Sequence, residues 1–329
     1  MIEMSTKFPE NIFHCTQSDF LQLSLDNFRF QYACNSVYRA FALRADRRPE
    51  QVASLTDIPF LPISFFKTHA LQSTGFKAEA VFESSGTTQA VPSRHYVKDL
   101  LLYKESFIRG FEKFYGPLSE WCIIGLLPSY LERKGSSLVL MVEELVRLSG
   151  KKESGLYLNE FDELALLLQG LEARGQATCL IGVTFALLDF AAAHPMQLNH
   201  TILMETGGMK GRGKELTRPE LHQLLRNQLG PGAIHSEYGM TELLSQAYSG
   251  GEGIFHPVPW MKVLVRDEDD PMAIRTEGSG ILNIIDLANR YSCSFISTDD
   301  VGKVNPDGSF EVFGRMDNSD IRGCSLLVL

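Results

Sequence analysis

The sequence predicts an α/β protein in which a mainly parallel sheet, flanked by helices, is joined to a β-rich part. Between residues 122 and 235, strand-like apolar runs alternate with helix-like segments, which is typical of parallel sheets with helices on their faces. After about residue 250 the helical pattern ends, and short apolar runs are separated by Asp, Gly and Pro turns. The chain has 329 residues, enough for one large or two medium domains with a substantial buried core.

The composition excludes several classes of protein. With 44% hydrophobic and 22% charged residues, the chain resembles an ordinary soluble protein. Its formal net charge of -9 argues against a nucleic-acid surface, which is normally basic. The six cysteines form no CxxC pair and have no histidine at zinc spacing, so they fit a reducing compartment. Because the sequence shows neither a signal pattern nor an apolar run long enough for a bilayer, we expect a cytoplasmic protein without a membrane span.

The first 75 residues are expected to be mainly helical and irregular. A helix-like apolar pattern covers residues 17–45. The run Ile58-Pro59-Phe60-Leu61-Pro62 then requires an extended path, since a residue before proline is pushed out of the helical region. Alternating apolar residues predict a strand over residues 78–82. Apolar residues at helical spacing then predict an amphipathic helix with the stripe Leu100, Tyr103, Phe107, Phe111 and Phe114.

The rest of the chain supplies the alternating elements. Strands are expected at 122–127, 178–182, 201–204 and 233–235, and helices at 136–149, 160–174, 184–193 and 218–229. Asn159 is the expected N-cap of the helix that ends at Gly175. Thr217 and Glu220 form a capping box for the last helix, which Gly230 ends. In the β-rich part, strands are expected at 261–265, 280–285, 295–298 and 309–313.

The segment Val81 to His95, VFESSGTTQAVPSRH, carries a loop rich in hydroxyls between the expected strand and the expected helix. Gly86 allows the backbone to turn where a Cβ would clash, so that amides and hydroxyls converge on an anion such as a phosphate. The hydroxyls around it belong to Ser84, Ser85, Thr87 and Thr88. No Gly-Lys-Ser/Thr follows at the Walker spacing. Taken alone, such a loop is more often a plain turn than a phosphate site.

Further loops carry suitable chemistry at positions where ligands bind in open α/β sheets, beyond the ends of strands. Glu205-Thr206-Gly207-Gly208 could bring bare backbone against a flat ring, or it could be a simple Gly-Gly turn. In Ser297-Thr298-Asp299-Asp300-Val301-Gly302, a carboxylate at a strand end could accept hydrogen bonds from two ribose hydroxyls, although paired Asp residues before Gly are also common turn formers.

The loop His235 to Glu242, HSEYGMTE, offers three kinds of contact. Tyr238 could stack on a base and Thr241 could donate to a phosphate oxygen. Glu242 could hold Mg²⁺, which prefers one or two carboxylates together with phosphate oxygens. The alternative is that Tyr238 is a core aromatic residue and Glu242 a carboxylate in the first turn of a helix.

The order of these loops resembles a known superfamily. SSGTT, Gly-Gly, EYGMTE, STDDVG and FGRMD look like the successive core motifs of the adenylate-forming enzymes (acyl-CoA synthetases, peptide-synthetase adenylation domains and luciferase), over residues 79–323. The resemblance implies that ATP and Mg²⁺ are bound, with Thr241 at the α-phosphate and Glu242 on Mg²⁺. Asp300 would bind ribose beside Arg315, although Asp299 stands where glycine is usual and leaves the choice between the two open. The triphosphate would lie against Ser84, Ser85, Gly86, Thr87 and Thr88, and adenine against Gly207, Gly208 and Tyr238.

Departures from the superfamily pattern point to one family within it. The first loop lacks the usual Thr-Gly-x-Pro-Lys, and the sequence stops at Leu329, so the small C-terminal lid domain with its catalytic lysine is expected to be absent. Both features resemble the acyl-protein synthetases of bacterial luminescence (LuxE type), which have a similar SSGTT…SRH segment and an IPxLPxxxFK-like stretch, here Ile58 to Lys67. In that family a cysteine near the C-terminus accepts the acyl group, and Cys324 stands in that place. Alternatively, Cys324 packs as a small apolar residue.

The resemblance implies a function and a division of the chain. The chain would convert a carboxylic acid, with fatty acids as the expected class, to acyl-AMP and transfer the acyl group to a protein cysteine for a partner, an acyl reductase or an acyl carrier. The alternatives are a coenzyme A ligase and a non-catalytic nucleotide- or acyl-binding subunit. The expected parts are a helical segment (1–75), the α/β core (76–250), the β-rich part (251–315) and a hinge-like tail (316–329). Candidates to replace the missing lysine are Lys67, Arg94 and Lys210, unless a partner supplies the cation. The histidines His95, His235 and His256 are expected to be structural, since adenylation needs no base.

Overall fold

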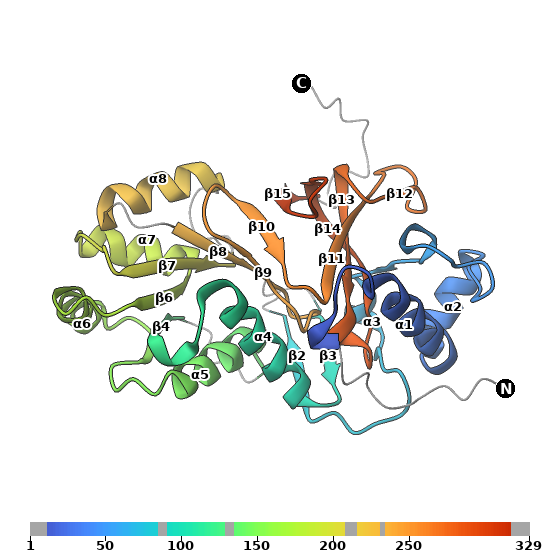
Figure 1. Ribbon diagram of the computed structural model, residues 1–329, viewed down its shortest axis with the longest axis horizontal. Helices are drawn as coiled ribbons and strands as arrows, with labels where there is room; N and C mark the ends of the chain where they lie inside the picture. The colour runs from blue at the N-terminus through green and yellow to red at the C-terminus, as the bar shows by residue number, and fades with distance from the viewer. Residues whose placement is uncertain (1–11, 85–90, 129–134, 208–215, 231–233, 317–329) are drawn as a thin grey trace.

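The computed structural model describes residues 12–84, 91–128, 135–207, 216–230 and 234–316. Within these ranges a 13-stranded sheet connects the two halves of the molecule, in the order β12-β11-β13-β14-β15-β10-β9-β8-β7-β6-β4-β5, with β1 paired to β14 off this path. In Figure 1 the half with α4 to α8 lies on the left and the half with α1 and α2 on the right. The expected β-rich part is therefore hydrogen-bonded to the α/β part as one sheet.

The left half has parallel strands with helices between them. Its strands are β4 (Cys122–Leu126), β5 (Gly155–Tyr157), β6 (Thr178–Val183), β7 (Thr201–Thr206) and β8 (Ile234–Tyr238), which pair in parallel. Every residue of β4 and β6 is buried, as expected for parallel strands that are covered on both faces. Its helices are α4 (Leu100–Tyr115), α5 (Ser137–Ser149), α6 (Phe161–Ala173), α7 (Thr184–Ala193) and α8 (Arg218–Leu229). The predicted mainly parallel sheet is confirmed.

The right half has antiparallel strands. They are β9 (Ala247–Ser249), β10 (Ile254–Pro257), β11 (Met261–Arg266), β12 (Ile274–Arg275), β13 (Gly278–Asp286), β14 (Phe295–Val304) and β15 (Phe310–Arg315). β9 pairs antiparallel with β8, so the sheet changes from parallel to antiparallel at this point. β14 runs through Ser297 to Gly302, and the expected loop there is a strand. The prediction failed because Asp299 and Asp300 are typical turn residues, whereas here their backbone pairs with neighbouring strands.

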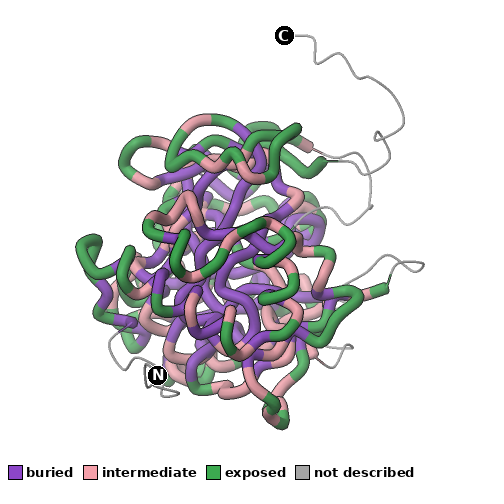
Figure 2. The backbone as a smooth tube through the Cα atoms, turned by 90° about the vertical axis from the view of Figure 1, so that its right-hand side faces the viewer, coloured by how far each residue is buried: buried purple, intermediate pink, exposed green. Residues whose placement is uncertain are grey.

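The N-terminal region packs on the right half. It contains α1 (Phe20–Cys34), α2 (Ser36–Arg44), β1 (Leu61–Pro62) and α3 (Phe65–Thr68), together with the 3₁₀ turns η1 (Ile12–His14) and η2 (Leu55–Asp57). The expected helix over 17–45 is in fact two helices, because Asn35 leaves the helical conformation and caps α2 through Val37 N and Tyr38 N. Aromatic side chains of this region, Phe28, Tyr38 and Phe60, surround Phe295 of β14. Figure 2 shows the buried backbone in the interior and the exposed segments around it.

The segment that carries the hydroxyl-rich loop differs from the prediction. It is a hairpin of β2 (Ala80–Glu83) and β3 (Arg94–Val97), so the loop connects two strands, and α4 follows only after β3. Asp99 caps α4 by accepting from Leu101 N at 2.8 Å.

The predicted helix caps fared differently. The capping box of Thr217 and Glu220 is confirmed. The predicted cap Asn159 is wrong, since the N-cap of α6 is Glu160, whose carboxylate accepts from Leu158 N and Asn159 N. Short 3₁₀ turns complete the described elements at η3 (Leu118–Glu120) and η4 (Leu287–Asn289). Among the described helices, none is both long and apolar enough to cross a bilayer.

Candidate active site

Three of the residues predicted from the motifs meet where β8, β14 and β15 come together. Asp300 and Arg315 are register partners on β14 and β15, and Arg315 Nε donates to Asp300 Oδ1 at 3.0 Å. Tyr238, the last residue of β8, donates its hydroxyl to Asp300 Oδ2 at 2.7 Å. The side chain of Asp300 is 6% exposed and that of Arg315 is 76% exposed. The result is a buried carboxylate held by two donors, one of which faces solvent.

The charges in this cluster reinforce one another. Burial, and then the negative charge of Asp300, raise the pKa of the Tyr238 hydroxyl well above its usual value, so it remains a donor. The charge of Asp300 also raises the pKa of Arg315. The Tyr238 ring packs against Phe255 and Phe310, at centroid distances of 5.8 and 5.2 Å. Tyr238 is therefore a core aromatic residue whose hydroxyl is committed to Asp300.

Asp299 and Asp300 have different neighbours in the structure. Successive residues of a strand point to opposite faces of a sheet. Asp300 contacts Tyr238 and Arg315, while the charge of Asp299 acts on Arg266, whose side chain also donates to Ser297 Oγ at 2.8 Å. Asp300, and not Asp299, thus lies with the other predicted residues.

Thr241 and Glu242 lie in a turn between β8 and β9, and not in the first turn of a helix. The Glu242 side chain is buried, with 5% of the residue exposed. Burial raises the pKa of its carboxyl, and a hydrogen bond from Ser93 and the positive charges of Arg315 and Lys67 partly oppose this. Glu242 is therefore a desolvated carboxylate close to two cations.

The base of the hydroxyl-rich loop reaches the same place. Ser84 N donates to Ser93 O at 3.1 Å, and Ser93 N donates to Ser84 Oγ at 2.8 Å. Because Ser93 also hydrogen-bonds Glu242, the two ends of this loop lie beside the Glu242 turn. The predicted phosphate-binding residues Ser85, Gly86, Thr87 and Thr88 lie outside the described residues.

The glycine turn lies at the neighbouring strand end. Gly207 follows β7 directly, with φ of +75°, and its carbonyl accepts from Thr184 Oγ1 at 3.2 Å. Strand pairing sets Thr206 opposite Glu237, so Gly207 comes next to the end of β8, where Tyr238 stands. Thr206 Oγ1 also donates to Glu237 Oε2 at 2.5 Å, and burial raises the pKa of Glu237 to about 7. Gly208 is outside the described part of the chain.

The three candidate cations differ in their surroundings. Lys67 lies in α3, is exposed and acts on Glu242. Arg94 pairs instead with Glu83 across the β2–β3 hairpin, with Nε and Oε1 at 3.1 Å. Lys210 and the predicted acyl acceptor Cys324 fall outside the described ranges.

Several residues near the site were not predicted to belong to it. His95 was expected to be merely structural, and Ser93, Asp286 and Asn289 were not singled out, yet each contacts the segment around Glu242. Ser93 and His95 lie in the SSGTT…SRH segment noted in the sequence, so this motif could have indicated that they lie near the site. Asp286 and Asn289 are 44 and 47 residues from Glu242 in the sequence. No local pattern reveals such a contact.

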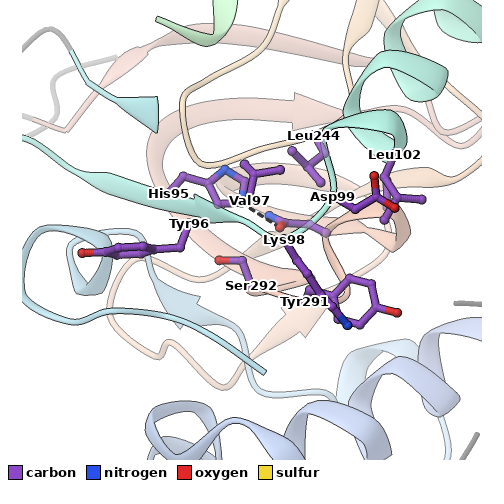
Figure 3. Close-up of a pocket in the computed structure, with 11 residues that line it drawn as sticks. His95, Tyr96, Val97, Lys98, Asp99, Leu102, Leu244, Tyr291 and Ser292 are labelled. Atoms are coloured by element: carbon purple, nitrogen blue, oxygen red, sulfur yellow. Dashed lines mark hydrogen bonds between the residues drawn. The ribbon is translucent and has the colours of Figure 1, made fainter. Parts of the chain in front are cut away.

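A separate small pocket lies beside His95 (Figure 3). Its wall includes Tyr96, Lys98, Tyr291 and Ser292, with Lys98 Nζ 3.9 Å from the centre of the Tyr291 ring. Tyr238, Glu242 and Asp300 do not line this pocket. The motif-derived residues therefore form a different site.

Comparisons with known proteins show which family and which folds the chain resembles. Residues 13–135 match the family model "Acyl-protein synthetase, LuxE". No curated protein matches the chain in sequence. The fold is similar to that of a 2-hydroxyisobutyryl-CoA ligase in the postadenylation state in complex with 2-HIB-AMP, with a TM-score of 0.63, 14% identity and coverage of 92% of this chain and 69% of that one.

Two further structures have the same fold. ATP-bound MatB from Rhodopseudomonas palustris has a TM-score of 0.53 at 17% identity, covering 86% of this chain and 58% of that one. An ATP-bound RpMatB-BxBclM chimera has a TM-score of 0.54 at 17% identity, covering 75% and 49%. This chain thus spans about half to two thirds of the length of these structures. The predicted α/β fold of the adenylate-forming enzymes is confirmed, and the resemblance to the acyl-protein synthetases is confirmed by the match to that family's model.

Proposed function

We propose, from the fold shared with adenylate-forming ligases and the match of residues 13–135 to the acyl-protein synthetase family, that this chain uses ATP to activate a carboxylic acid. One observation carries the proposal. Asp300, with its partners Tyr238 and Arg315, lies in one electrostatic neighbourhood with Glu242. These residues come from three separate sequence motifs, and each offers the chemistry that a nucleotide requires.

The reaction would proceed by adenylation. A carboxylate is a poor acyl donor because an oxide would have to leave. If a carboxylate oxygen attacks the α-phosphorus of ATP, the bond to pyrophosphate breaks and acyl-AMP forms, from which AMP leaves readily. In such phosphoryl-group chemistry a protein mainly positions the groups and neutralises charge.

The residues of the site suit these tasks. The Asp300 carboxylate accepts one bond on each oxygen and has lone pairs left for two ribose hydroxyls. Gly207, at the strand end next to Tyr238, would border adenine, and Gly208 is proposed for the same role. Thr241 would contact the α-phosphate, and the loop from Ser84 to Thr88 the other phosphates.

Glu242 fits Mg²⁺ for a reason given by its surroundings. A desolvated carboxylate with a raised pKa is stabilised by a nearby cation, and Mg²⁺ is commonly held by one or two carboxylates with phosphate oxygens as the remaining ligands. When bound, Mg²⁺ would offset the negative charge of the phosphates. Within the described residues no group of three or more His, Cys, Asp or Glu gathers as a metal site. Glu242 would hold the ion together with oxygens of the substrate.

We assign to Lys67 the role of a cation beside Glu242, because its charge acts on Glu242 while Arg94 is paired with Glu83. Lys67→Gln is expected to slow pyrophosphate exchange about tenfold, because it removes one positive charge near Glu242. Lys77→Gln, an exposed lysine outside the site, serves as the matched control. Equal rates for the two variants would remove Lys67 from the mechanism.

The acyl acceptor is the finer part of the proposal. The family match supports transfer to a protein thiol, and Cys324 is the candidate. Its thiolate would attack the acyl carbonyl carbon, forming the thioester and releasing AMP. The acid would be a fatty acid, and an acyl reductase or acyl carrier would take the acyl group from the enzyme. Coenzyme A is the second candidate acceptor, because a similar fold belongs to a CoA ligase.

The test is ATP–pyrophosphate exchange with a panel of carboxylic acids of different chain lengths. Exchange with at least one acid is expected, and no exchange with any acid would contradict the proposal. Mass spectrometry of the intact protein after incubation with ATP, Mg²⁺ and acid then reports the acyl group and its site. Cys324→Ser should still exchange pyrophosphate but carry no thioester. Formation of acyl-CoA by Cys324→Ser would instead favour coenzyme A.

A further inference from the structure

The turn that carries Glu242 is held by side chains from distant parts of the chain. The backbone carbonyl of Thr241 accepts from His95 Nδ1 at 2.8 Å, and that of Glu242 accepts from Asn289 Nδ2 at 2.7 Å. His95 Nε2 lies 3.0 Å from Asn289 Oδ1, so these two side chains also contact each other. Neither Thr241 nor Glu242 belongs to a helix or strand, so the geometry of their carbonyls depends on such partners.

The same turn is held on its other side by Asp286. One carboxylate oxygen of Asp286 accepts from Leu244 N at 2.8 Å and Ser245 N at 3.0 Å. The other oxygen accepts from Ser245 Oγ at 2.6 Å and from Ala288 N at 3.1 Å, which caps η4. Asp286 therefore connects the turn to η4, which ends at Asn289. We call His95, Asp286 and Asn289 together the turn clamp.

The turn clamp is rigid because it is enclosed. His95 and Asp286 are 0% exposed and Asn289 is 1% exposed. The His95 ring meets Phe66 and Phe82 edge-on, at centroid distances of 5.7 and 6.4 Å. A buried polar network leaves little freedom, because breaking any of its bonds strands a donor or acceptor away from water. His95 and Asn289 bond carbonyls of the turn and contact each other, and Asp286 accepts from amides of the turn and of η4. A change in any of the three would therefore act on Glu242 through the turn.

We propose that His95, Asp286 and Asn289 are positioning residues that hold the Glu242 carboxylate in the geometry required for Mg²⁺ bound with ATP. The inference rests on the proposed function in one respect, the assignment of Glu242 as the Mg²⁺ ligand. Mg²⁺ demands nearly ideal octahedral geometry, so a displaced carboxylate binds it poorly. Loss of outer partners of metal ligands typically costs 10- to 100-fold in affinity or activity.

The test compares His95→Leu, which loses the hydrogen bond to Thr241 O, with His95→Gln, whose amide keeps a donor for Thr241 O. Binding of Mn²⁺ in the presence of ATP is measured by equilibrium dialysis, as the excess of Mn²⁺ on the protein side of the membrane, which needs no turnover. His95→Leu is expected to weaken Mn²⁺ binding 10- to 100-fold, and His95→Gln less than about threefold. His222→Leu, a buried histidine of α8 outside the clamp, is the matched control and should bind Mn²⁺ as the unchanged protein does.

A double variant separates positioning from a general loss of structure. If His95 acts through Glu242, His95→Leu combined with Glu242→Gln binds Mn²⁺ no more weakly than Glu242→Gln alone. Hydrogen exchange of the Leu244 and Ser245 amides should become faster in His95→Leu, while peptides of β4 and β6 stay protected. If His95→Leu does not fold, Asn289→Ala, which removes the donor to Glu242 O, replaces it in each measurement.

These measurements test the role of the turn clamp without requiring that the protein catalyse adenylation. A folded clamp variant with unchanged Mn²⁺ binding, additive losses in the double variant, or unchanged hydrogen exchange in the turn would overturn it. Failure of the unchanged protein to bind Mn²⁺ with ATP would also overturn it. If Mn²⁺ is bound but no acid supports pyrophosphate exchange, the proposed function fails and the clamp is still judged on its own measurements.

Discussion

At the level of single residues, Asp300 joins candidate-site residues that come from different strands. It lies on β14, while its partners Tyr238 and Arg315 come from the ends of β8 and β15. A hydrogen bond to a charged group is worth about 1.5–3 kcal/mol, and tenfold in affinity is about 1.4 kcal/mol. Changes at this residue therefore have effects large enough to measure.

Asp300→Asn is expected to raise the KM for ATP about 10- to 100-fold, because the variant loses the charge that would hold the ribose hydroxyls. ATP–pyrophosphate exchange at varied ATP concentration measures this. Asp299→Asn is the matched control, since Asp299 is the preceding residue of the same strand and points to the other face. A larger effect at Asp299 than at Asp300 would contradict the assignment.

The raised pKa of Glu237 predicts how the stability of the protein depends on pH. Burial raises its pKa to about 7 from 4.5, so between these values the folded protein keeps a proton that the unfolded chain has lost. The unfolded state then binds fewer protons, and stability falls as the pH rises through this window, by up to about 3 kcal/mol. Glu237→Gln removes the titration while keeping an acceptor for Thr206. The free energy of unfolding of Glu237→Gln minus that of the unchanged protein should therefore increase from pH 5 to pH 8, as measured by urea denaturation.

His95 has the opposite effect on stability as the pH changes. Both groups therefore contribute to the pH dependence of the unchanged protein's free energy of unfolding. Burial lowers its pKa from 6.5 to about 4, so the unfolded chain binds the extra proton first as the pH falls. The stability linked to His95 is present above pH 6.5 and is lost toward pH 4. For this reason the Glu237 test uses the difference between the two proteins. A difference that is flat with pH would show that Glu237 is already ionised in the folded state.

At the level of elements, the position of Arg315 depends on close pairing of β14 and β15. A Cβ at Gly302 would lie 2.1 Å from the backbone carbonyl oxygen of Glu311 on the partner strand. Gly302→Ala is therefore expected to force the strands apart and to lower the free energy of unfolding by about 1–3 kcal/mol. It should also raise the KM for ATP, since Asp300 and Arg315 pair two residues away.

Gly170→Ala is the matched control for Gly302→Ala. Gly170 lies inside α6 with nothing within 4 Å of an added Cβ. Alanine is favoured over glycine in a helix by about 1 kcal/mol, so stability should rise slightly and the KM should not change. Urea denaturation and pyrophosphate exchange of both variants provide the comparison. Stabilisation by Gly302→Ala would mean that the two strands are not as close as described.

The sequence predicted helices and strands correctly in segments where a single pattern, an apolar run or helical spacing, dominates. The fully buried strands β4 and β6 and the amphipathic helix α4 follow from apolar runs and helical spacing alone. The prediction failed at Asp299 and Asp300, because a strand stabilised by tertiary pairing overrides local turn preference. Similarly, the motifs predicted Tyr238, Asp300 and Glu242, but contacts made by Asp286 and Asn289 depend on the folded topology and leave no local signal.

At the level of the whole molecule, α1 supports the site indirectly. Gln31 Nε2 donates to the carbonyls of Asn289 at 3.3 Å and Arg290 at 2.9 Å, and its Oε1 accepts from Ser294 N at 3.2 Å. Gln31 is 0% exposed, so no water would replace it. The N-terminal region that matches the family model therefore holds the segment that in turn holds the Glu242 turn.

Gln31→Met, similar in shape, is expected to lower the free energy of unfolding by about 2–4 kcal/mol, since it leaves buried backbone groups without their partner. Mn²⁺ binding with ATP should weaken as well. Gln22→Met, on the exposed side of the same helix, should change stability by less than about 0.5 kcal/mol. Chemical denaturation of both variants measures this, and similar losses at the two positions would argue against a special role for Gln31.

The continuity of the sheet from β5 to β12 also bears on how the protein can be divided. A cut between β9 and β10 would uncover two rows of unpaired amides and carbonyls, which are templates for association with other chains. Neither fragment should then stay monomeric in solution, and a protease should find no site there that releases two intact pieces. Engineers who wish to exchange the strands of the candidate site with those of another protein should therefore graft across the entire sheet.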